Sequence, residues 1–153
     1  MDMIFEKIVS GGQTGVDRAA LDVALELELP CGGWCPKGRR AEDGRISDRY
    51  PMEEASSPDY RVRTELNVQD SDGTLILARG RLAGGTLLTL KLARRFHKPY
   101  FVVDLVQGGD VTSVREWGQT EKIGILNVAG PREGEAPGIH AQASSFLREV
   151  LEG

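Results

Sequence analysis

A glycine-rich stretch, Ser10–Arg18, has the composition of an anion-binding turn. It follows a short apolar run, Ile4–Val9, and precedes apolar residues that recur at helical spacing from Val16 to Leu27. In a strand–turn–helix arrangement, backbone N–H groups at the start of the helix can bind a phosphate. The stretch is neither a Walker A loop nor a G-x-G-x-x-G fingerprint. It therefore predicts an anion cradle without identifying the ligand.

The same stretch also fits an ordinary strand-to-helix turn. Thr14 would then be the N-cap of the helix, and Asp17, three residues on, would complete a capping box. Because Asp17 lies at a helix start, we expect its carboxylate to be readily ionised. That state suits capping or hydroxyl binding better than general-acid catalysis. This loop alone leaves both interpretations open.

Two further glycine turns follow apolar runs later in the chain. Gly80–Thr86 follows the continuous apolar run Thr74–Ala78, and Ala129–Gly134 follows Ile123–Val128. Continuous apolar runs of this length are typical of strands that are buried on both faces of a parallel sheet. We expect all three turns at the carboxyl edge of one sheet, where open α/β folds bind ligands. Three glycine turns at one edge favour a phosphate-type or nucleotide-type site.

Strands and helices alternate along the whole sequence. Further strands are predicted at Cys31–Pro36 and Pro99–Leu105, and helices are predicted over residues 15–28, 60–70, about 86–97, 111–122 and from 137 onward. This alternation predicts an α/β fold, a three-layer Rossmann-like sandwich with a mostly parallel sheet of about five strands and helices on both faces. Residues 1–153 are expected to form a single ligand-binding domain.

Two polar segments are also candidates for the site. The helix predicted over residues 60–70 places Tyr60, Arg63, Thr64 and Asn67 along one polar face. Residues 37–60 have no clear period and contain glycine and proline breakers, and their first part is rich in basic side chains. A loop of this length inside a small domain is usually functional. We therefore expect it to be a lid that becomes ordered when ligand binds.

The composition restricts the class of protein. The 153 residues carry a formal net charge of −4, which argues against a nucleic-acid-binding surface. No apolar run is long enough to span a membrane and the N-terminus does not resemble a signal peptide, so a cytoplasmic location is expected. Two cysteines, Cys31 and Cys35, and two isolated histidines do not have zinc-site spacing. We expect no metal ion bound directly by side chains.

Five motifs, in order, resemble those of a known family. They are Ser10–Arg18, Gly33–Arg39, Thr64–Val68, Gly84–Thr86 and Asn127–Glu133. Together they are similar to the putative molybdenum carrier family, a YpsA-related branch of the SLOG superfamily of Rossmann-like proteins. The resemblance spans nearly the whole chain. It implies a Rossmann-like fold, a nucleotide-derived or pterin ligand such as molybdenum cofactor, and a homo-oligomer.

One departure from the superfamily concerns catalysis. Its cytokinin-activating phosphoribohydrolases carry a G-G-x-G-T loop that leads to a catalytic glutamate. Here Gly84–Thr86 lacks the intervening residue, and Leu87–Leu90 offers no carboxylate. Cleavage of a glycosidic bond needs a nearby carboxyl group. If the chain is such an enzyme, the resemblance leaves Asp17 or Glu133 to supply that group.

Three functions remain open. The first is a cytoplasmic carrier or sensor for a phosphate-bearing nucleotide-derived or pterin ligand. The second is an enzyme that cleaves or transfers a group on a nucleotide, with Asp17 and Glu133 as acid–base candidates. The third is an interaction module without a small ligand. In the first, the ligand would contact glycine-turn, hydroxyl, amide and cationic groups, namely Gly11, Gly12, Gln13, Thr14, Gly15, Lys37, Arg39, Asn67, Gly84, Gly85, Thr86, Asn127, Gly130 and Arg132.

Overall fold

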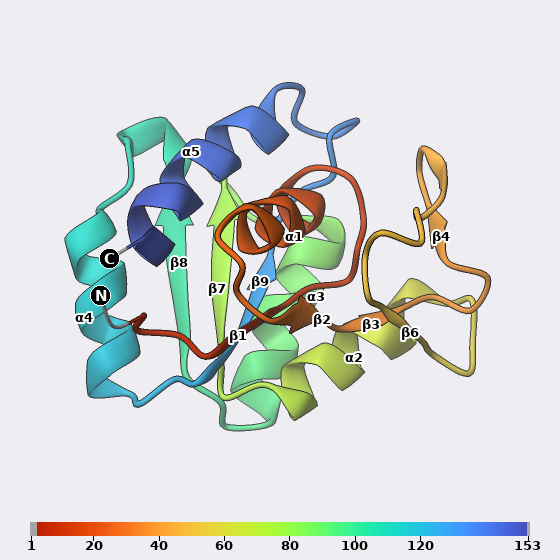
Figure 1. The fold of residues 1–153 in the computed structure, drawn as a ribbon, viewed down its shortest axis with the longest axis horizontal. Coiled ribbons are helices and arrows are strands. Elements are labelled where there is room, and N and C mark those ends of the chain that lie inside the picture. The colour runs from red at the N-terminus through yellow and green to blue at the C-terminus, as the bar shows by residue number, and fades with distance from the viewer. Residues whose placement is uncertain (1–2, 153) are drawn as a thin grey trace.

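A five-stranded parallel sheet forms the centre of the computed structural model, which describes residues 3–152 (Figure 1). The strand order is β2-β1-β9-β7-β8, and every neighbouring pair is parallel. In that order the strands span Cys31–Gly32, Lys7–Val9, Ile125–Ala129, Gly73–Ala78 and Tyr100–Asp104. β7 is buried at every position because it lies inside the sheet with helices on both faces.

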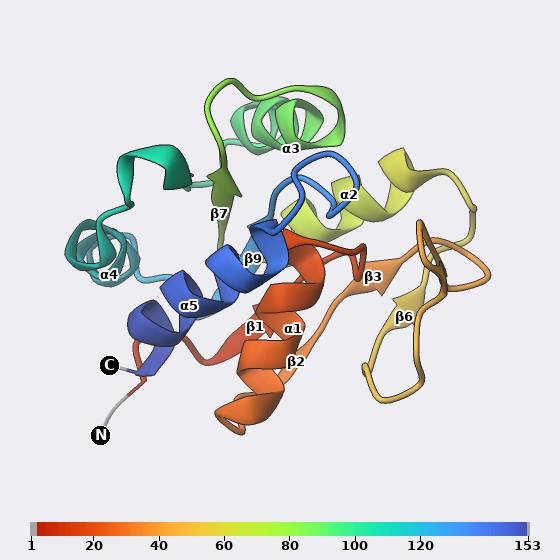
Figure 2. The same ribbon diagram turned by 90° about the horizontal axis from the view of Figure 1, so that it is seen from above.

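Helices cover both faces of this sheet (Figure 2). On one face α1 packs against α5, and α4 lies beside α5; on the other face α2 packs against α3. The helices are α1 (Val16–Glu26), α2 (Tyr60–Asp70), α3 (Gly84–Arg95), α4 (Val111–Thr120) and α5 (Ile139–Glu152). A short 3₁₀ helix, Leu105–Gln107, follows β8. The predicted three-layer Rossmann-like sandwich is confirmed.

The direction in which the chain leaves each strand creates a crevice above β9. After β1 the chain enters α1 on one face, and after β7 it enters α3 on the opposite face. β9 lies between these two strands. The first turns of α1 and α3 therefore flank the carboxyl end of β9, the place where parallel sheets bind ligands.

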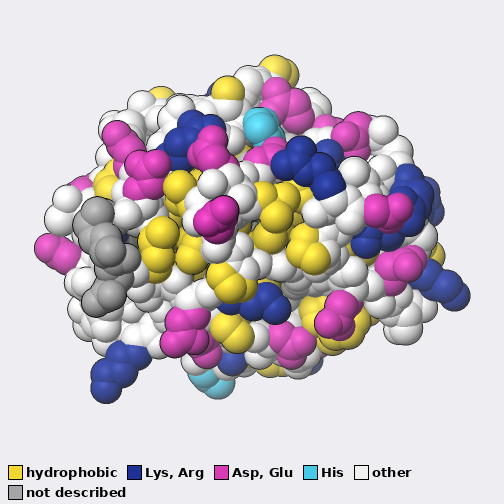
Figure 3. Space-filling view, viewed as in Figure 1, with side chains coloured by type: hydrophobic (Ala, Val, Ile, Leu, Met, Phe, Trp, Pro, Cys, Tyr) yellow, Lys and Arg dark blue, Asp and Glu magenta, His cyan; other side chains and the backbone are white. Residues whose placement is uncertain are grey.

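The largest apolar core lies between the sheet and the layer formed by α1, α4 and α5. It includes Phe5, Ile8, Leu126 and Leu147, each at most 1% exposed. Figure 3 shows this side of the molecule, where apolar side chains gather around α1 and α5 and charged side chains surround them. No helix within residues 3–152 has the length and apolar character needed to span a membrane.

The assembly of the chain into a homo-oligomer stays a prediction.

Several element boundaries differ from the sequence-based prediction. The segment predicted as one strand over 31–36 is divided at Gly33 into β2 and β3 (Trp34–Cys35), which belong to different sheets. α1 begins at Val16, and its N-cap is Gly15, which has a φ of 78° and no side-chain cap. The predicted Thr14–Asp17 capping box is therefore wrong.

Residues 37–58 form a folded appendage beside α1 rather than a segment without structure. Two small two-stranded sheets hold it together, one pairing β3 with β6 and the other pairing β4 with β5. These strands are β4 (Arg40–Ala41), β5 (Gly44–Arg45) and β6 (Glu53–Glu54). Ile46 and Tyr50 from this segment pack with Leu21 and Cys35 in a core of their own.

Arg39 organises the appendage from inside. The residue is only 8% exposed, and its guanidinium donates hydrogen bonds to the carbonyls of Ile46 (3.1 Å), Ser47 (2.8 Å) and Tyr50 (2.8 Å). The Tyr50 hydroxyl in turn donates to Asp22 Oδ1 on α1 at 2.5 Å. Burial and this carboxylate raise the pKa of Tyr50 to about 12, so the hydroxyl stays protonated. Arg39 thus has a structural role in the fold.

We expect Arg39→Ala to lower the free energy of unfolding by about 2–4 kcal/mol, because three charge-assisted hydrogen bonds are lost and buried carbonyls are left unpaired. Urea unfolding followed by circular dichroism measures this loss. The control is Arg40→Ala, which removes an exposed arginine next to it and should change stability by about 0.5 kcal/mol or less. Equal effects of the two substitutions would contradict the structural role.

Candidate functional site

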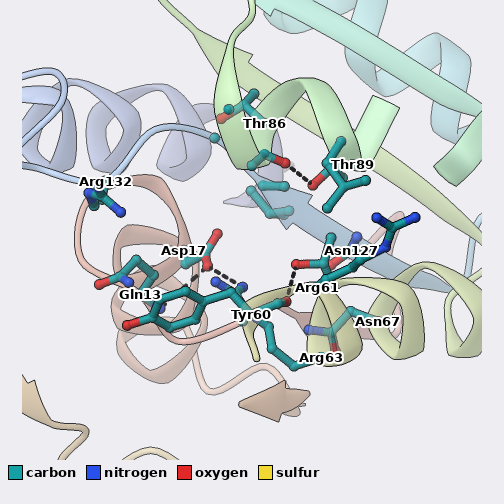
Figure 4. A pocket seen from close by; sticks show the side chains of 18 of the residues that line it. Gln13, Asp17, Tyr60, Arg61, Arg63, Asn67, Thr86, Thr89, Asn127 and Arg132 are labelled. Atoms are coloured by element: carbon teal, nitrogen blue, oxygen red, sulfur yellow. Dashed lines mark hydrogen bonds and ion pairs between the residues drawn. The ribbon is translucent and has the colours of Figure 1, made fainter. Parts of the chain in front are cut away.

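A cleft of about 290 Å³ lies at the carboxyl edge of the sheet, between the first turns of α1 and α3 (Figure 4). Its wall includes ten residues that the sequence singled out, namely Gly11, Gln13, Asp17, Asn67, Gly84, Gly85, Thr86, Asn127, Gly130 and Arg132. Its volume is at the lower end of the range of about 300–1,000 Å³ that is usual for small-molecule sites. The cleft therefore has room for a ligand of about the size of a mononucleotide.

The first turn of α3 presents hydrogen-bond donors that the protein does not use. Within residues 3–152, no acceptor contacts the backbone N–H groups of Gly84, Gly85 and Thr86, and no side chain caps the helix. The Thr86 residue is only 7% exposed, and its hydroxyl has no hydrogen-bond partner in that same range. The positive end of the helix dipole adds to these donors. This turn is suited to an anionic group.

The first glycine turn differs, because most of its donors already have partners. The N–H groups of Gly12, Gln13 and Thr14 donate to Ser10 Oγ (3.3 Å), Asp17 Oδ2 (3.3 Å) and Gln13 Oε1 (3.0 Å). Val16 N–H donates to the Pro131 carbonyl at 3.2 Å. The anion cradle expected here is therefore largely closed by internal hydrogen bonds. The second glycine turn, at α3, provides the open donors instead.

Asp17 and Arg63 form a buried ion pair across the cleft. Asp17 comes from α1 and Arg63 from α2, and Arg63 Nη1 donates to Asp17 Oδ2 at 3.1 Å. Their side chains are only 6% and 13% exposed. Burial raises the pKa of Asp17, and the Arg63 guanidinium opposes that shift. The expected helix-capping role of Asp17 is wrong, because its side chain is buried in the cleft wall and paired with Arg63.

Two asparagines that the sequence proposed as ligand-binding residues have different surroundings. The Asn67 amide is held by the backbone of Trp34, accepting from its N–H at 2.8 Å and donating to its carbonyl at 2.9 Å. Asn127 donates to Thr74 Oγ1 at 3.2 Å, and its Oδ1 has no partner in the part of the chain that the structure describes. Asn67 therefore fixes α2 against β3, whereas Asn127 keeps an acceptor for a ligand.

Two arginines stand at the rim of the cleft. Arg132 is restrained by Glu42 at 3.1 Å and, more weakly, by Glu135 at 3.8 Å. Arg61 is exposed, and no carboxylate of residues 3–152 forms an ion pair with it. Arg61 and Glu135 were not identified from the sequence. Helix periodicity could not identify Arg61, because residues three and four apart share a helix face and adjacent residues such as Tyr60 and Arg61 do not.

Six candidate residues lie outside the cleft lining, namely Gly12, Thr14, Gly15, Lys37, Arg39 and Glu133. A Cβ on Gly12 would approach Ile46 Cδ1 at 2.9 Å, so this glycine faces the appendage. Thr14 bonds to Glu42 and accepts from Glu133 N–H at 3.1 Å. Lys37 and Arg39 belong to the appendage, and no residue of 37–58 lines the cleft. The appendage therefore does not cover the cleft as the expected lid would.

Glu133 caps the N-terminal end of α5. Its carboxylate accepts from the N–H groups of Gly138 (2.6 Å) and His140 (3.0 Å). These hydrogen bonds, the one from His140 first, hold the pKa of Glu133 below its ordinary value of 4.5. The Glu133 carboxylate therefore has a structural role as a helix cap, and it does not line the cleft, where an acid–base group would be needed.

The capping role predicts a pH dependence. Because the pKa of Glu133 is depressed in the folded state, its contribution to stability is present above pH 4.5 and is lost as the pH falls through the folded-state value. Glu133→Gln should therefore lower the melting temperature at pH 7, and the difference from the wild type should narrow toward pH 3. Thermal melts across this range measure it. The control, Glu149→Gln on the exposed side of α5, should show no such convergence.

The sequence and the fold are similar to those of known proteins. The model of the circularly permutated YpsA SLOG family matches residues 8–151, a range that includes all three glycine turns. A crystal structure of a "putative molybdenum carrier protein" from Syntrophus aciditrophicus SB is 44% identical, with a TM-score of 0.94 and 98% of each chain covered. A comparison with curated proteins gave no match.

Proposed function

The chain belongs to the circularly permutated YpsA SLOG family, and from this premise we propose that it is a carrier or sensor that binds a phosphate-bearing ligand. The observation that supports this proposal is the first turn of α3. Gly84, Gly85 and Thr86 line the cleft, and their N–H groups and the Thr86 hydroxyl have no partner among residues 3–152. Donors that have no protein partner favour an anionic ligand group at this position.

The positive charges at the rim of the cleft also favour an anionic ligand group. Arg61 and Arg132 lie at the rim, and both can approach a phosphate through the planar guanidinium. For Arg132, this approach requires exchange of its contact with Glu42. The polar groups deeper in the cleft, among them Asn127 and Gln13, are suited to the uncharged part of a ligand.

Molybdenum cofactor is one candidate cargo, because the similar crystal structure bears the name of a molybdenum carrier. The residues present fit its organic part. The turn at α3 offers donors for its phosphate, and the free acceptor of Asn127 offers a partner for an N–H group of a pterin. Within residues 3–152 no group of three His, Cys, Asp or Glu side chains could hold a metal ion. The proposed contacts are therefore to the organic part.

Asp17 supports a second candidate function, an enzyme that cleaves or transfers a group on a nucleotide. A buried carboxyl with a raised pKa inside a cleft is a feature of acid–base sites. Incubating the protein with nucleoside monophosphates and assaying free base and phosphate tests this function. Release of product that Asp17→Asn abolishes would support the enzyme, and binding without release would support the carrier.

Gly85→Asp tests the anion site at α3 without removing any packing. A Cβ there would meet no atom within 4 Å, and an acid in the first turn stabilises a helix. The new carboxylate occupies the free donors and repels a phosphate. We expect the melting temperature to be kept or raised, while calorimetric affinity for nucleoside monophosphates and for phosphate falls by more than about tenfold.

Thr112→Asp is the matched control, since it places the same charge in the first turn of α4, outside the cleft. It should leave the affinity unchanged. Native mass spectrometry of the wild type, purified without added ligand, complements the titration because it identifies any small molecule that co-purifies. Unchanged phosphate affinity in Gly85→Asp would overturn the proposed anion site.

A further inference from the structure

One oxygen of the Asp17 carboxylate is left for a ligand. Oδ2 accepts from Gln13 N–H at 3.3 Å and from Arg63 Nη1 at 3.1 Å. Oδ1 accepts from no group among residues 3–152, although the residue is 96% buried, being only 4% exposed. Figure 4 shows this second oxygen directed away from Arg63, toward the open part of the cleft on the side of Thr86. Oδ1 is therefore an acceptor that stays accessible from the cleft, where a donor group of a ligand can reach it.

The Arg63 guanidinium is only partly occupied, because Nη1 donates to Asp17 while Nε has no partner among residues 3–152. A Cβ on Gly11 would overlap Arg63 Nη1, so the guanidinium lies against the backbone of the first glycine turn. Both members of the ion pair line the cleft, and Asp17 Oδ1 is an acceptor that the pair leaves without a donor among residues 3–152. The donors for an anion lie on the other wall, at α3.

The cleft thus has two chemically different ends. One end offers N–H and O–H donors to an anion, with the Glu135 carboxylate beside Gly84, and the other walls offer Asp17 Oδ1 and Asn127 Oδ1 as acceptors. A bare oxyanion would satisfy only the first end, and the nearby carboxylate would repel it. A phosphate monoester that carries hydroxyl or amino groups would satisfy both ends.

We propose that Asp17 is the specificity-determining residue of this site, accepting a hydrogen bond from a hydroxyl or amino group of a phosphorylated organic ligand. The site then prefers such a phosphate monoester to inorganic phosphate or molybdate. This inference rests on the proposed function, because it assumes that the phosphate binds at α3. It adds the chemistry of the other end of the ligand.

Asp17→Asn tests this role directly, because neighbouring donors fix the orientation of the new side-chain amide. Gln13 N–H and Arg63 Nη1 are both donors, so they retain the amide oxygen. The amide NH₂ group then points into the cleft, where the wild type has an acceptor. The substitution keeps the shape of the side chain and replaces an acceptor by a donor.

The experiment measures the affinities of wild type and Asp17→Asn by calorimetric titration with four probes. Inorganic phosphate and molybdate are the bare oxyanions. Ribose 5-phosphate supplies hydroxyl donors, and guanosine monophosphate supplies an amino edge as well. We expect the wild type to prefer a monoester to inorganic phosphate by roughly tenfold to a hundredfold. Asp17→Asn should abolish that preference while binding the bare oxyanions as well as, or better than, the wild type.

The control for charge and stability is Asp22→Asn. Asp22 lies on α1 but outside the cleft, where it bonds to Tyr50 and His140. It should leave the monoester preference intact. Thermal melts of both variants show whether any loss of affinity follows from unfolding, in which case binding of all four probes would fall together.

The outcomes separate the two proposals. Loss of the monoester preference in Asp17→Asn alone supports the specificity role, and the probe that loses more identifies a hydroxyl or an amino donor. If the wild type binds phosphate and both monoesters equally, or if Asp17→Asn keeps the melting temperature of the wild type and weakens all probes equally, the specificity role is wrong and the anion site stands. If no phosphate compound binds the wild type at millimolar concentration, the proposed function itself falls.

Discussion

The buried ion pair between Asp17 and Arg63 connects the two helical layers at the carboxyl edge of the sheet. Asp17 belongs to α1 on one face and Arg63 to α2 on the other, so the pair spans the crevice above β9. Charges removed from water are stable only when each has a partner, which fixes the positions of both helices relative to the sheet. The pair also requires a glycine at position 11, because any side chain there would overlap Arg63. Both side chains line the cleft, so this contact contributes to its shape and to the polarity of its wall.

The three glycine turns at the sheet edge have different roles. The N–H groups of Gly12, Gln13 and Thr14 in the first turn donate internal hydrogen bonds. The third turn packs against the first, and its Pro131 carbonyl accepts from Val16 N–H at 3.2 Å. Glu42 strengthens this joint by accepting from Gly134 N–H at 2.8 Å and by pairing with Arg132 at 3.1 Å. Both turns thereby form a rigid wall. The second turn, at the start of α3, has no such partners within the described chain, so it is the one suited to hold an anion.

The sequence by itself determined the architecture, because hydrophobic periodicity is a local signal. The continuous apolar run at 74–78 became the buried strand β7, and the polar helix predicted over 60–70 has those same bounds as α2. The glycine turns were found because each one follows an apolar run that predicts a strand. Since the carboxyl ends of parallel strands lie at the same edge of a sheet, the turns were expected together at that edge. The helix face bearing Tyr60, Arg63, Thr64 and Asn67 was found for the same reason, since residues three and four apart share one side of a helix.

Only the tertiary structure decided which of these groups are free. A hydrogen-bonding group is available to a ligand when no other part of the chain reaches it, and the partners here lie far apart in sequence. The Arg39 guanidinium is satisfied by carbonyls of the appendage, and Glu133 is satisfied by the start of α5. Asp17 is paired with a residue 46 positions away, and burial there raises its pKa, whereas the sequence suggested a carboxylate suited to capping or hydroxyl binding. Composition and spacing specify which donors and acceptors exist, whereas packing of distant segments specifies which of them remain for a ligand.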